Sequence, residues 1–461
     1  MANPSPVSYS SPVGKVGGGR EVFPNASLDL IAAAPENSWV QLNSNTFKDC
    51  WAPAGLRTVL PPKNLFRAWS SFAWDKKRHG FWLWGGGHAN YEGNEVYFWS
   101  AVTRIWSLAF HTSTVKRYSI KYTEGHANYN KIYSASDGAM APLSAHTYDN
   151  NIYLPILDRF LTFGGAGQGL GRPFEVFDDN ENTLRRMGAY TLQLDLAGQG
   201  FLGGLPGLNY KGAGYESASL PGARAWEPRD WLLDNASYIA MNIASNSHVN
   251  GGTVYTQENG HDVLYWTRLQ VSSRGMVRTE FVDHDYRNDI HTKLNNYNDA
   301  GGGQGVIALD PTRKIILELI KVSQTNIAQA YDIDAQQSYK ITAFNGTAED
   351  VADFYADLSG ADTGLDFDPV RGYFVAWDKG PRVWRIDAPT PLASAGWTVT
   401  RLNSTTSPAP VDAMLDGQTG TLGKWEYAPD MDCFVGAIEP ENGHVWAFKP
   451  ANWKDPRISN G

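Results

Sequence analysis

The sequence predicts an all-β protein of the β-propeller class, and three observations lead to that prediction. The chain of 461 residues holds 17 Trp, 22 Tyr and 19 Phe, together with 46 Gly. Aromatic residues favour strands, and glycine favours tight turns and bulges. Short apolar segments recur between turn residues, while helical periodicity is nearly absent. Residues 347–358 form the best candidate for a short helix.

A repeated unit is clearest in the C-terminal half. Residues 309–317, 367–375 and 427–435 align, and each segment reads as a short strand, a turn that contains proline, and a second strand. A third strand follows each unit, and residues 339–344 and 397–402 supply a fourth strand to two of them. Four such strands joined by turns and loops make one propeller blade.

The N-terminal half repeats this pattern with longer insertions. Three further units are expected there, at residues 72–108, 146–194 and 253–282. The last unit of the chain lacks a fourth strand, and residues 38–42 are expected to supply it and to close the ring. A closed ring leaves no open sheet edge for aggregation. We count six blades, and the interruptions at 110–140 and 200–245 are long enough to hold a seventh.

The chain is expected to form one propeller domain, residues 26–461, preceded by an extended arm, residues 1–25. The arm is rich in Ser, Pro and Gly and lacks the apolar periodicity of a packed element. Order in such an arm would indicate docking on a neighbouring chain. The chain as given shows no secretory signal and no stretch as long as a membrane span, so no membrane insertion is expected.

Charge and motif patterns exclude several classes of ligand. The net charge is -9, and no run of Lys and Arg offers a nucleic-acid surface. The glycine-rich runs at 164–171 and 301–305 lack the Lys-Ser/Thr of a P-loop. Cys50 and Cys433 are too few for a disulfide scaffold and are expected to be reduced, buried thiols. We therefore expect no nucleic-acid partner and no cofactor.

One histidine-containing segment resembles a metal site in residue type alone. Asp283, His284 and Asp285 lie near His291, but their spacing matches no metal motif. A solvated loop is the preferred interpretation, and no bound metal is expected.

Three parts of the sequence resemble the kelch-like propellers that include the ulvan-type polysaccharide lyases. They are Gly85 to Tyr97 (GGGHANYEGNEVY), Ala145 to Tyr148 together with the later Phe163-Gly164-Gly165, and Gly423 to Pro429. The resemblance implies seven blades and a groove across the ring, in which His, Tyr and Arg cleave an acidic polysaccharide by β-elimination. Similar propellers occur in many bacterial and bacteriophage proteins, and a fold does not by itself carry a function.

Catalytic candidates follow from what β-elimination requires. The reaction needs a group that neutralises the uronic carboxylate, a base for the adjacent proton and an acid for the leaving oxygen, and His, Tyr and Arg suit these roles. The resemblance implies His126 and His146 as the catalytic pair, and Tyr190 and Arg224 are candidates for their partners. His126 lies in a long insertion, where functional residues tend to be found. A structural role between blades is the alternative for His146, and no Tyr and Arg after it match the family's spacing.

Substrate-binding candidates come from a motif that occurs twice. Gly-His-Ala-Asn-Tyr is found at residues 87–91 and 125–129. We expect its His and Tyr residues, and the Tyr that follows His146, to contact a glycan: His88, Tyr91, Tyr129 and Tyr148. For His88 a hydrogen bond within a blade turn is the alternative.

Two functions are compatible with these features. The favoured one is a glycan-facing component of a bacteriophage virion or another extracellular surface, used for attachment or carbohydrate binding. Such a protein needs no signal peptide, and its N-terminal arm would contact other virion proteins. The alternative is a lyase that cleaves a uronic-acid polysaccharide. A polysaccharide or surface glycan is the expected partner in both cases.

Overall fold

The computed structural model describes most of the strand-forming part of the chain. The described residues are 23–51, 61–87, 91, 93, 95–110, 115–117, 132–134, 142, 144–163, 166–167, 175–177, 183–186, 189–197, 225–229, 231–241, 251–267, 275–297, 304–322, 325–357, 363–378, 380–403 and 420–458.

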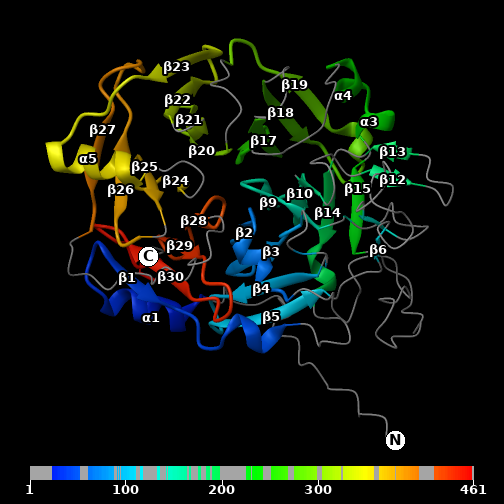
Figure 1. Cartoon of the computed structure of the whole chain (residues 1–461), viewed down its shortest axis with the longest axis horizontal. Helices are drawn as coiled ribbons and strands as arrows, with labels where there is room; N and C mark the ends of the chain where they lie inside the picture. Colours follow the sequence, from blue (N-terminus) through cyan, green and yellow to red (C-terminus); the bar gives the residue numbers. More distant parts are fainter. Residues whose placement is uncertain are drawn as a thin grey trace, which may run out of the picture.

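Six four-stranded antiparallel sheets, here called blades 1 to 6, form the body of the described structure. Figure 1 shows them around a common centre. Blade 1 consists of β2 (Ser71–Asp75), β3 (Gly80–Trp84), β4 (Val96–Ser100) and β5 (Ile105–Phe110). Blade 2 consists of β9 (Asn151–Leu154), β10 (Arg159–Thr162), β14 (Ala189–Gln193) and β15 (Trp226–Arg229). Blade 3 consists of β16 (Thr253–Glu258), β17 (His261–Thr267), β18 (Met276–Phe281) and β19 (Ile290–Lys293).

Blade 4 consists of β20 (Gln304–Asp310), β21 (Ile315–Val322), β22 (Thr325–Asp332) and β23 (Gln337–Ile341). Blade 5 consists of β24 (Gly364–Asp368), β25 (Tyr373–Trp377), β26 (Val383–Asp387) and β27 (Thr398–Arg401). Blade 6 consists of β28 (Trp425–Ala428), β29 (Cys433–Ala437), β30 (Val445–Lys449) and β1 (Ser38–Gln41). The first strand of each blade contacts the first strand of the next, in the order β2, β9, β16, β20, β24 and β28, and β28 contacts β2. These six are the inner strands.

Three two-stranded sheets and several short helices accompany the six blades. Three two-stranded sheets pair β6 (Val115–Arg117) with β7 (Ile132–Ser134), β8 (Ala145–His146) with β11 (Ala166–Gly167), and β12 (Glu175–Phe177) with β13 (Thr183–Arg186). The helices are α1 (Asn25–Ala33), α2 (Asn64–Arg67), α3 (Trp231–Asp234), α4 (Ala236–Ala240) and α5 (Ala348–Asp357), with single 3-10 turns at Phe47–Cys50, Leu194–Leu196 and Tyr286–Asn288. No helix among the described residues is long and apolar enough to cross a membrane.

A four-residue turn joins the first two strands of five blades, and its sequence explains its shape. Residues 155–158, 311–314, 369–372 and 429–432 begin with proline, whose fixed φ suits the start of a turn. The fourth turn residue has a positive φ in all five blades, between 48° and 77°. Where an aspartate precedes the turn, its carboxylate accepts two backbone N–H groups of the turn, as Asp368 does from Val370 and Arg371 at 3.0 Å each.

Arginines in two of these turns form ion pairs with aspartates of the next blade. Arg371 donates to Asp368 in its own blade and to Asp432 in blade 6, at 2.9 and 2.7 Å. Arg78 makes the equivalent pairs with Asp75 and with Asp158 in blade 2. Each arginine thus ties two consecutive blades at their turns.

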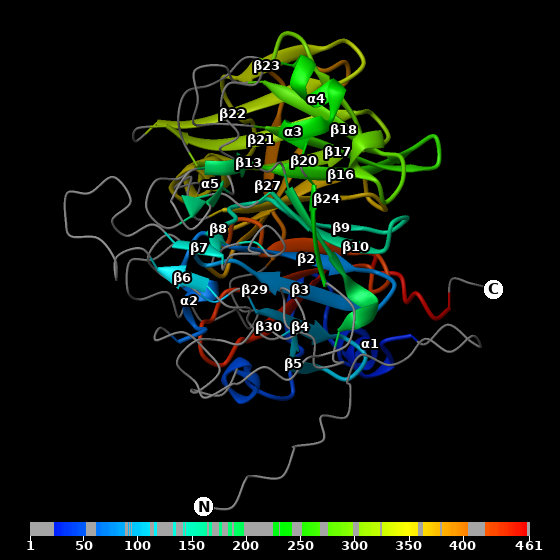
Figure 2. The same ribbon diagram turned by 90° about the vertical axis from the view of Figure 1, so that its right-hand side faces the viewer.

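The N-terminal segment packs against blades 1 and 6. Strand β1 is antiparallel to β30, with Trp39 opposite Phe448 and Gln41 opposite Trp446. Helix α1 lies beside blade 1 (Figure 2), where the Ser27 hydroxyl donates to the Ala101 carbonyl at 2.6 Å. Residues 38–41 therefore take the outermost position in the blade that contains the C-terminal strands.

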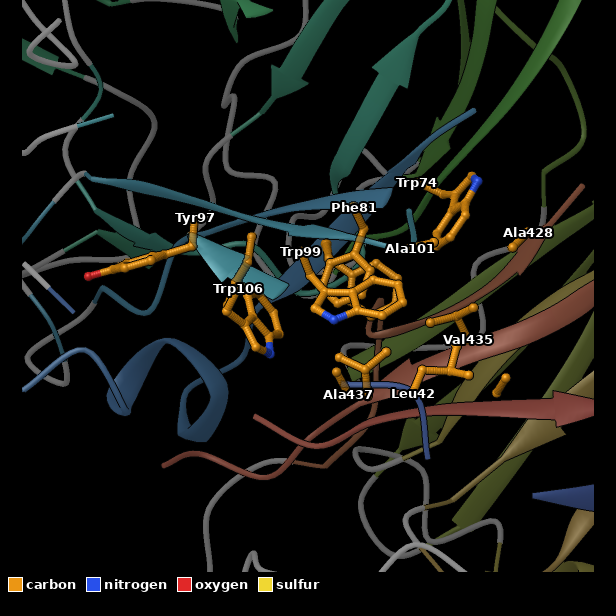
Figure 3. Packing of buried hydrophobic residues seen from close by; sticks show 14 of the residues in the cluster. Leu42, Trp74, Phe81, Tyr97, Trp99, Ala101, Trp106, Ala428, Val435 and Ala437 are labelled. Atoms are coloured by element: carbon orange, nitrogen blue, oxygen red, sulfur yellow. The ribbon is translucent and has the colours of Figure 1, made fainter. Parts of the chain in front are cut away.

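A large apolar core joins blade 1 to blade 6. Phe81 and Trp99 lie 5.5 Å apart between ring centroids, and Trp106 meets Phe81 edge-on at 5.2 Å. Val435 and Leu42 belong to the same buried cluster (Figure 3). Aromatic residues on successive strands thus supply most of the apolar surface that holds these two blades together.

The structure corrects two expectations and confirms others. The described residues form six blades, so the seven blades implied by the resemblance are wrong. The sequence has room for a seventh blade at residues 110–140 or 200–245. In the first range the described strands are β6 and β7, which form a two-stranded sheet. In the second range the described strand is β15, which belongs to blade 2. Blade 2 starts at β9, because residues 145–146 pair with β11 in a separate two-stranded sheet.

Helix α5 lies where a helix was expected. Cys50 and Cys433 are free thiols, as expected; Cys433 is buried, but Cys50 is half-buried, which corrects the expectation that both are buried. The arm was expected over residues 1–25, and residues 1–22 of it lie outside the described part.

Candidate functional site

A cavity of about 320 Å³ lies at the centre of the six blades and is lined by residues from every inner strand. Its size is at the lower end of the range of small-molecule sites, roughly 300 to 1,000 Å³. Lys76, Pro311, Pro369 and Pro429 also line it and are exposed, so its mouth lies on the side of the four-residue turns.

Equivalent residues of the six inner strands form a collar around this cavity. In five blades the collar residue is the second-last of the inner strand before the four-residue turn, and in blade 3 it is Tyr255, opposite Leu264. All six residues belong to the lining of the cavity, and five are aromatic. The aromatic collar consists of Trp74, Tyr153, Tyr255, Leu309, Phe367 and Tyr427.

Polar tips of four collar rings are held by aspartates near the turns. The Tyr427 hydroxyl donates to Asp432 at 2.6 Å, and Trp74 Nε1 donates to Asp430 at 2.7 Å. Tyr153 and Tyr255 make the same kind of bond, to Asp158 at 3.0 Å and to Asp262 at 2.9 Å. Burial and these carboxylates raise the pKa of the three tyrosines, so their hydroxyls remain neutral. The rings are therefore oriented before any ligand arrives, which lowers the entropic cost of binding.

Three carboxyl groups line the same cavity deeper than the collar. Asp366 and Glu426 each precede a collar residue, and Asp149 lies just before β9. Glu426 Oε2 accepts from the backbone N–H of Trp74 at 2.8 Å, and Asp366 Oδ2 accepts from that of Tyr427 at 2.6 Å. Asp149 Oδ2 accepts from the Ile307 N–H at 3.2 Å. Each carboxyl thus reaches the inner strand of another blade.

Burial changes the pKa of these three carboxyl groups. Burial raises the pKa of Asp366 to about 6, and the nearby Asp368 carboxylate adds to the rise. Burial also raises the pKa of Glu426 and Asp149 well above the ordinary range, and the negative charge of Asp366 adds to both shifts. All three side chains are nevertheless only half-buried, because they face the cavity. Burial thus disfavours the ionised form of all three carboxyl groups.

His146 and Tyr148 lie at the other end of the inner strands. Both precede β9, whereas the cavity mouth lies beyond the ends of these strands. The His146 ring is 4.5 Å from that of Trp69 and 6.0 Å from that of Tyr148, measured between centroids. The Tyr148 N–H donates to the Trp69 carbonyl at 2.9 Å. The side chains of His146 and Tyr148 are 1% and 4% exposed, so both are buried.

The remaining predicted site residues do not line the cavity or lie outside the described part. Tyr190 is on β14, the third strand of blade 2, where its ring packs on that of Trp226. Tyr91 is buried, and its hydroxyl donates to the Glu95 carboxylate. The other four, His88, His126, Tyr129 and Arg224, lie outside the described residues. The catalytic and binding roles assigned from the sequence stay predictions.

The segment Asp283 to Asp285 forms an exposed loop. The Asp283 carboxylate accepts from the Asp285 N–H at 2.7 Å and from the Asn288 side chain at 2.9 Å. His291 instead packs between Trp231 and Tyr238, and burial lowers its pKa to about 3. Over the described ranges, no group of His, Cys, Asp and Glu is arranged to hold a metal ion.

Sequence reasoning missed the collar and the carboxyls. A local signal for the collar exists, because an aromatic residue stands two positions before the turn proline in Tyr153, Phe367 and Tyr427. No comparable signal links Asp149, Asp366 and Glu426, which lie far apart in the chain.

Comparisons with known proteins provide no family. No protein-family model matches the sequence, and no curated protein matches it significantly. The expected kelch-like membership therefore stays a prediction.

Several solved structures are similar at a low level. An auxiliary nutrient binding protein from Bacteroides thetaiotaomicron VPI-5482 matches with a TM-score of 0.41 and 12% identity, over 83% of this chain and 68% of its own. A second auxiliary nutrient binding protein, from Bacteroides ovatus ATCC 8483, has a TM-score of 0.40 and 9% identity, over 90% and 76%. The GH74 xyloglucanase from Xanthomonas campestris has a TM-score of 0.38 and 12% identity, over 86% and 46%.

Proposed function

We propose that this propeller binds a carbohydrate in its central cavity. The observation that supports the proposal is the aromatic collar, with carboxyl groups directly below it. A sugar ring has apolar C–H faces, which pack on aromatic rings, and hydroxyl groups, which donate hydrogen bonds to carboxyl oxygens. A cavity with a few polar groups among apolar walls is the usual form of a small-molecule site.

Binding without cleavage is the activity that we propose. The described candidates for β-elimination, His146 and Tyr190, are each 1% exposed, and neither lines the cavity. A polymer cannot contact such side chains unless the chain that covers them moves. The lyase alternative stays a prediction, and absorbance of unsaturated products in the ultraviolet tests it on a panel of uronic-acid polysaccharides.

A glycan array tests the binding proposal. We expect the wild-type protein to retain a defined set of glycans and Tyr255→Ala to lose them, because Tyr255 is a half-buried collar ring. Tyr355→Ala is the matched control, since Tyr355 is an exposed tyrosine on α5 that does not line the cavity. Equal retention by Tyr255→Ala and wild type would place the glycan elsewhere, and no retained glycan at all would contradict the proposal.

The biological setting that we propose is a bacteriophage virion or another extracellular surface, where a rigid propeller serves for attachment. The first 25 residues, which the sequence predicts to form an extended arm, support this setting as a segment suited to contact other virion proteins. Mass spectrometry of purified particles tests it: the protein is expected as a stoichiometric component, and its absence from the particles would argue against a virion role.

A further inference from the structure

We propose that the ligand of the central cavity is an amino sugar, whose protonated amine binds beside Glu426 and Asp149. This inference rests on the proposed carbohydrate-binding function and names the class of sugar. Three features support it: the charges that line the cavity, its unpaired acceptor atoms, and the poorer fit of other ligand classes.

The charges around the cavity are unbalanced. Among the described lining residues, three acidic side chains point to a single enclosed space: Asp149, Asp366 and Glu426. Lys76 is the one basic side chain that the described lining contains, and it is exposed at the mouth. Burial without a nearby cation disfavours the ionised form of these carboxyl groups, and a ligand with a positive charge would favour it.

Acceptor atoms at the cavity lack donors. Glu426 and Asp149 each use one carboxyl oxygen for a backbone N–H, and in the described structure neither Glu426 Oε1 nor Asp149 Oδ1 receives a hydrogen bond. Asn151 adds independent evidence. It lines the cavity, is 2% exposed, and donates through Nδ2 to the Ser71 and Trp84 carbonyls at 2.9 Å each.

The amide oxygen of Asn151, Oδ1, is buried without a hydrogen-bond partner in that same part of the chain. Native proteins rarely leave such an acceptor unsatisfied. An ammonium group brings three N–H donors and a positive charge, and both favour the ionised form of Glu426 and Asp149, whose free oxygens then accept from it.

Other ligand classes fit this arrangement less well. A uronic acid would add a negative charge to a space that already holds three carboxyl groups, and like charges at close range repel. A neutral sugar offers hydroxyl groups to the carboxyls but no positive charge that would favour their ionised form. Metal binding has no support, because the described His, Cys, Asp and Glu residues include no group with metal-site geometry.

Calorimetric titration with two matched oligosaccharides tests the inference. Oligomers of glucosamine and of N-acetylglucosamine share ring and linkage and differ in the charge of the amine. We expect the free-amine oligomer to bind the wild-type protein at least about tenfold more tightly, the scale of one charge-assisted hydrogen bond. Glu426→Gln is expected to remove most of this preference, so that the two oligomers bind the variant with affinities within about twofold of each other. Glu349→Gln, a change of an exposed glutamate on α5, is the control.

The outcomes separate the inference from the proposal beneath it. Equal affinity for both oligomers would overturn the amino-sugar inference and leave carbohydrate binding intact. Binding of neither oligomer, with another glycan retained in the collar, would also overturn the inference alone. If no glycan of any class binds, both fail. Should Glu426→Gln not fold, judged by circular dichroism, Asp149→Asn and the wild-type comparison decide in its place.

Discussion

Asp366 shows how a single residue links stability to the site. Its carboxylate accepts the N–H groups of Phe367 and Tyr427, at 2.7 and 2.6 Å, while burial raises its pKa from 3.8 to about 6. The folded protein therefore holds the proton of Asp366 more tightly than the unfolded chain. The resulting stabilisation is complete below the unfolded pKa and is lost as the pH rises through the folded pKa.

Asp366→Asn is expected to remove this pH dependence. The free energy of unfolding of the wild type, minus that of the variant, should fall by roughly 3 kcal/mol between about pH 4 and about pH 6, and then stay level. The difference also contains a part that does not depend on pH, because the amide of the variant accepts the two backbone N–H groups less well than the carboxylate does. Urea denaturation at a series of pH values measures it.

Groups that face Asp366 also titrate, namely Asp149, Glu426 and Asp368, so the comparison uses the difference between variant and wild type. A difference that stays constant from pH 4 to pH 7 would show that Asp366 is not perturbed in the folded protein.

At the scale of elements, the turn arginines join consecutive blades. The Arg371 side chain is 8% exposed, and its partners Asp368 and Asp432 are 0% and 6% exposed. Arg371→Ala would leave two buried carboxylates unpaired. The expected loss in the free energy of unfolding is about 3 to 5 kcal/mol.

The matched control for this change is Arg287→Ala. Arg287 and its partner Asp285 are 61% and 37% exposed in their side chains, and an exposed ion pair contributes little to stability. Both variants are compared by urea denaturation. A loss for Arg371→Ala no larger than that for Arg287→Ala would contradict a role for these arginines in holding the blades together.

Strand β1 carries a second prediction at this scale. Trp39 is 3% exposed, and its ring centroid lies 5.0 Å from that of Trp377 and 5.3 Å from that of Phe448. Trp39→Ala is expected to lower the free energy of unfolding by about 3 to 5 kcal/mol. Gln41→Ala on the same strand, where the side chain is exposed, should change it by no more than about 0.5 kcal/mol.

We propose that the pairing of β1 with β30 closes the ring, and the comparison of Trp39→Ala with Gln41→Ala tests how much the strand contributes. If thermal and chemical denaturation show the same stability for both variants, β1 adds little to the fold.

Elements built by local chemistry could be predicted from sequence. The Asp-Pro turns at Asp310 and Asp368 set the ends of two strands through neighbouring atoms alone, so the hairpins after them were found. Strand β9 was missed, although Tyr153-Leu154-Pro155 has the same form as Tyr427-Ala428-Pro429. The residues around His146, expected to form the first strand of blade 2, instead pair with β11 in a separate sheet. A pairing of only two residues leaves no recognisable pattern in the sequence.

At the scale of the whole molecule, the site exists only through the arrangement of the blades. Asp149, Asp366 and Glu426 come from three blades and share one cavity because the inner strands surround a common centre. Hydrophobic alternation along a strand cannot show which strands meet there, so the carboxyls could not be identified from sequence. The six blades counted from the repeated strands are confirmed, whereas the seven implied by the resemblance are wrong, because resemblance to a family does not count sheets.

The most direct test of carbohydrate binding at the centre of the propeller is a crystal structure of the protein soaked with the oligosaccharide that it retains best. We predict electron density for a sugar ring inside the aromatic collar, in contact with Tyr153, Tyr255 or Tyr427. Density confined to another surface, such as the opposite face near His146 and Tyr148, would contradict the account.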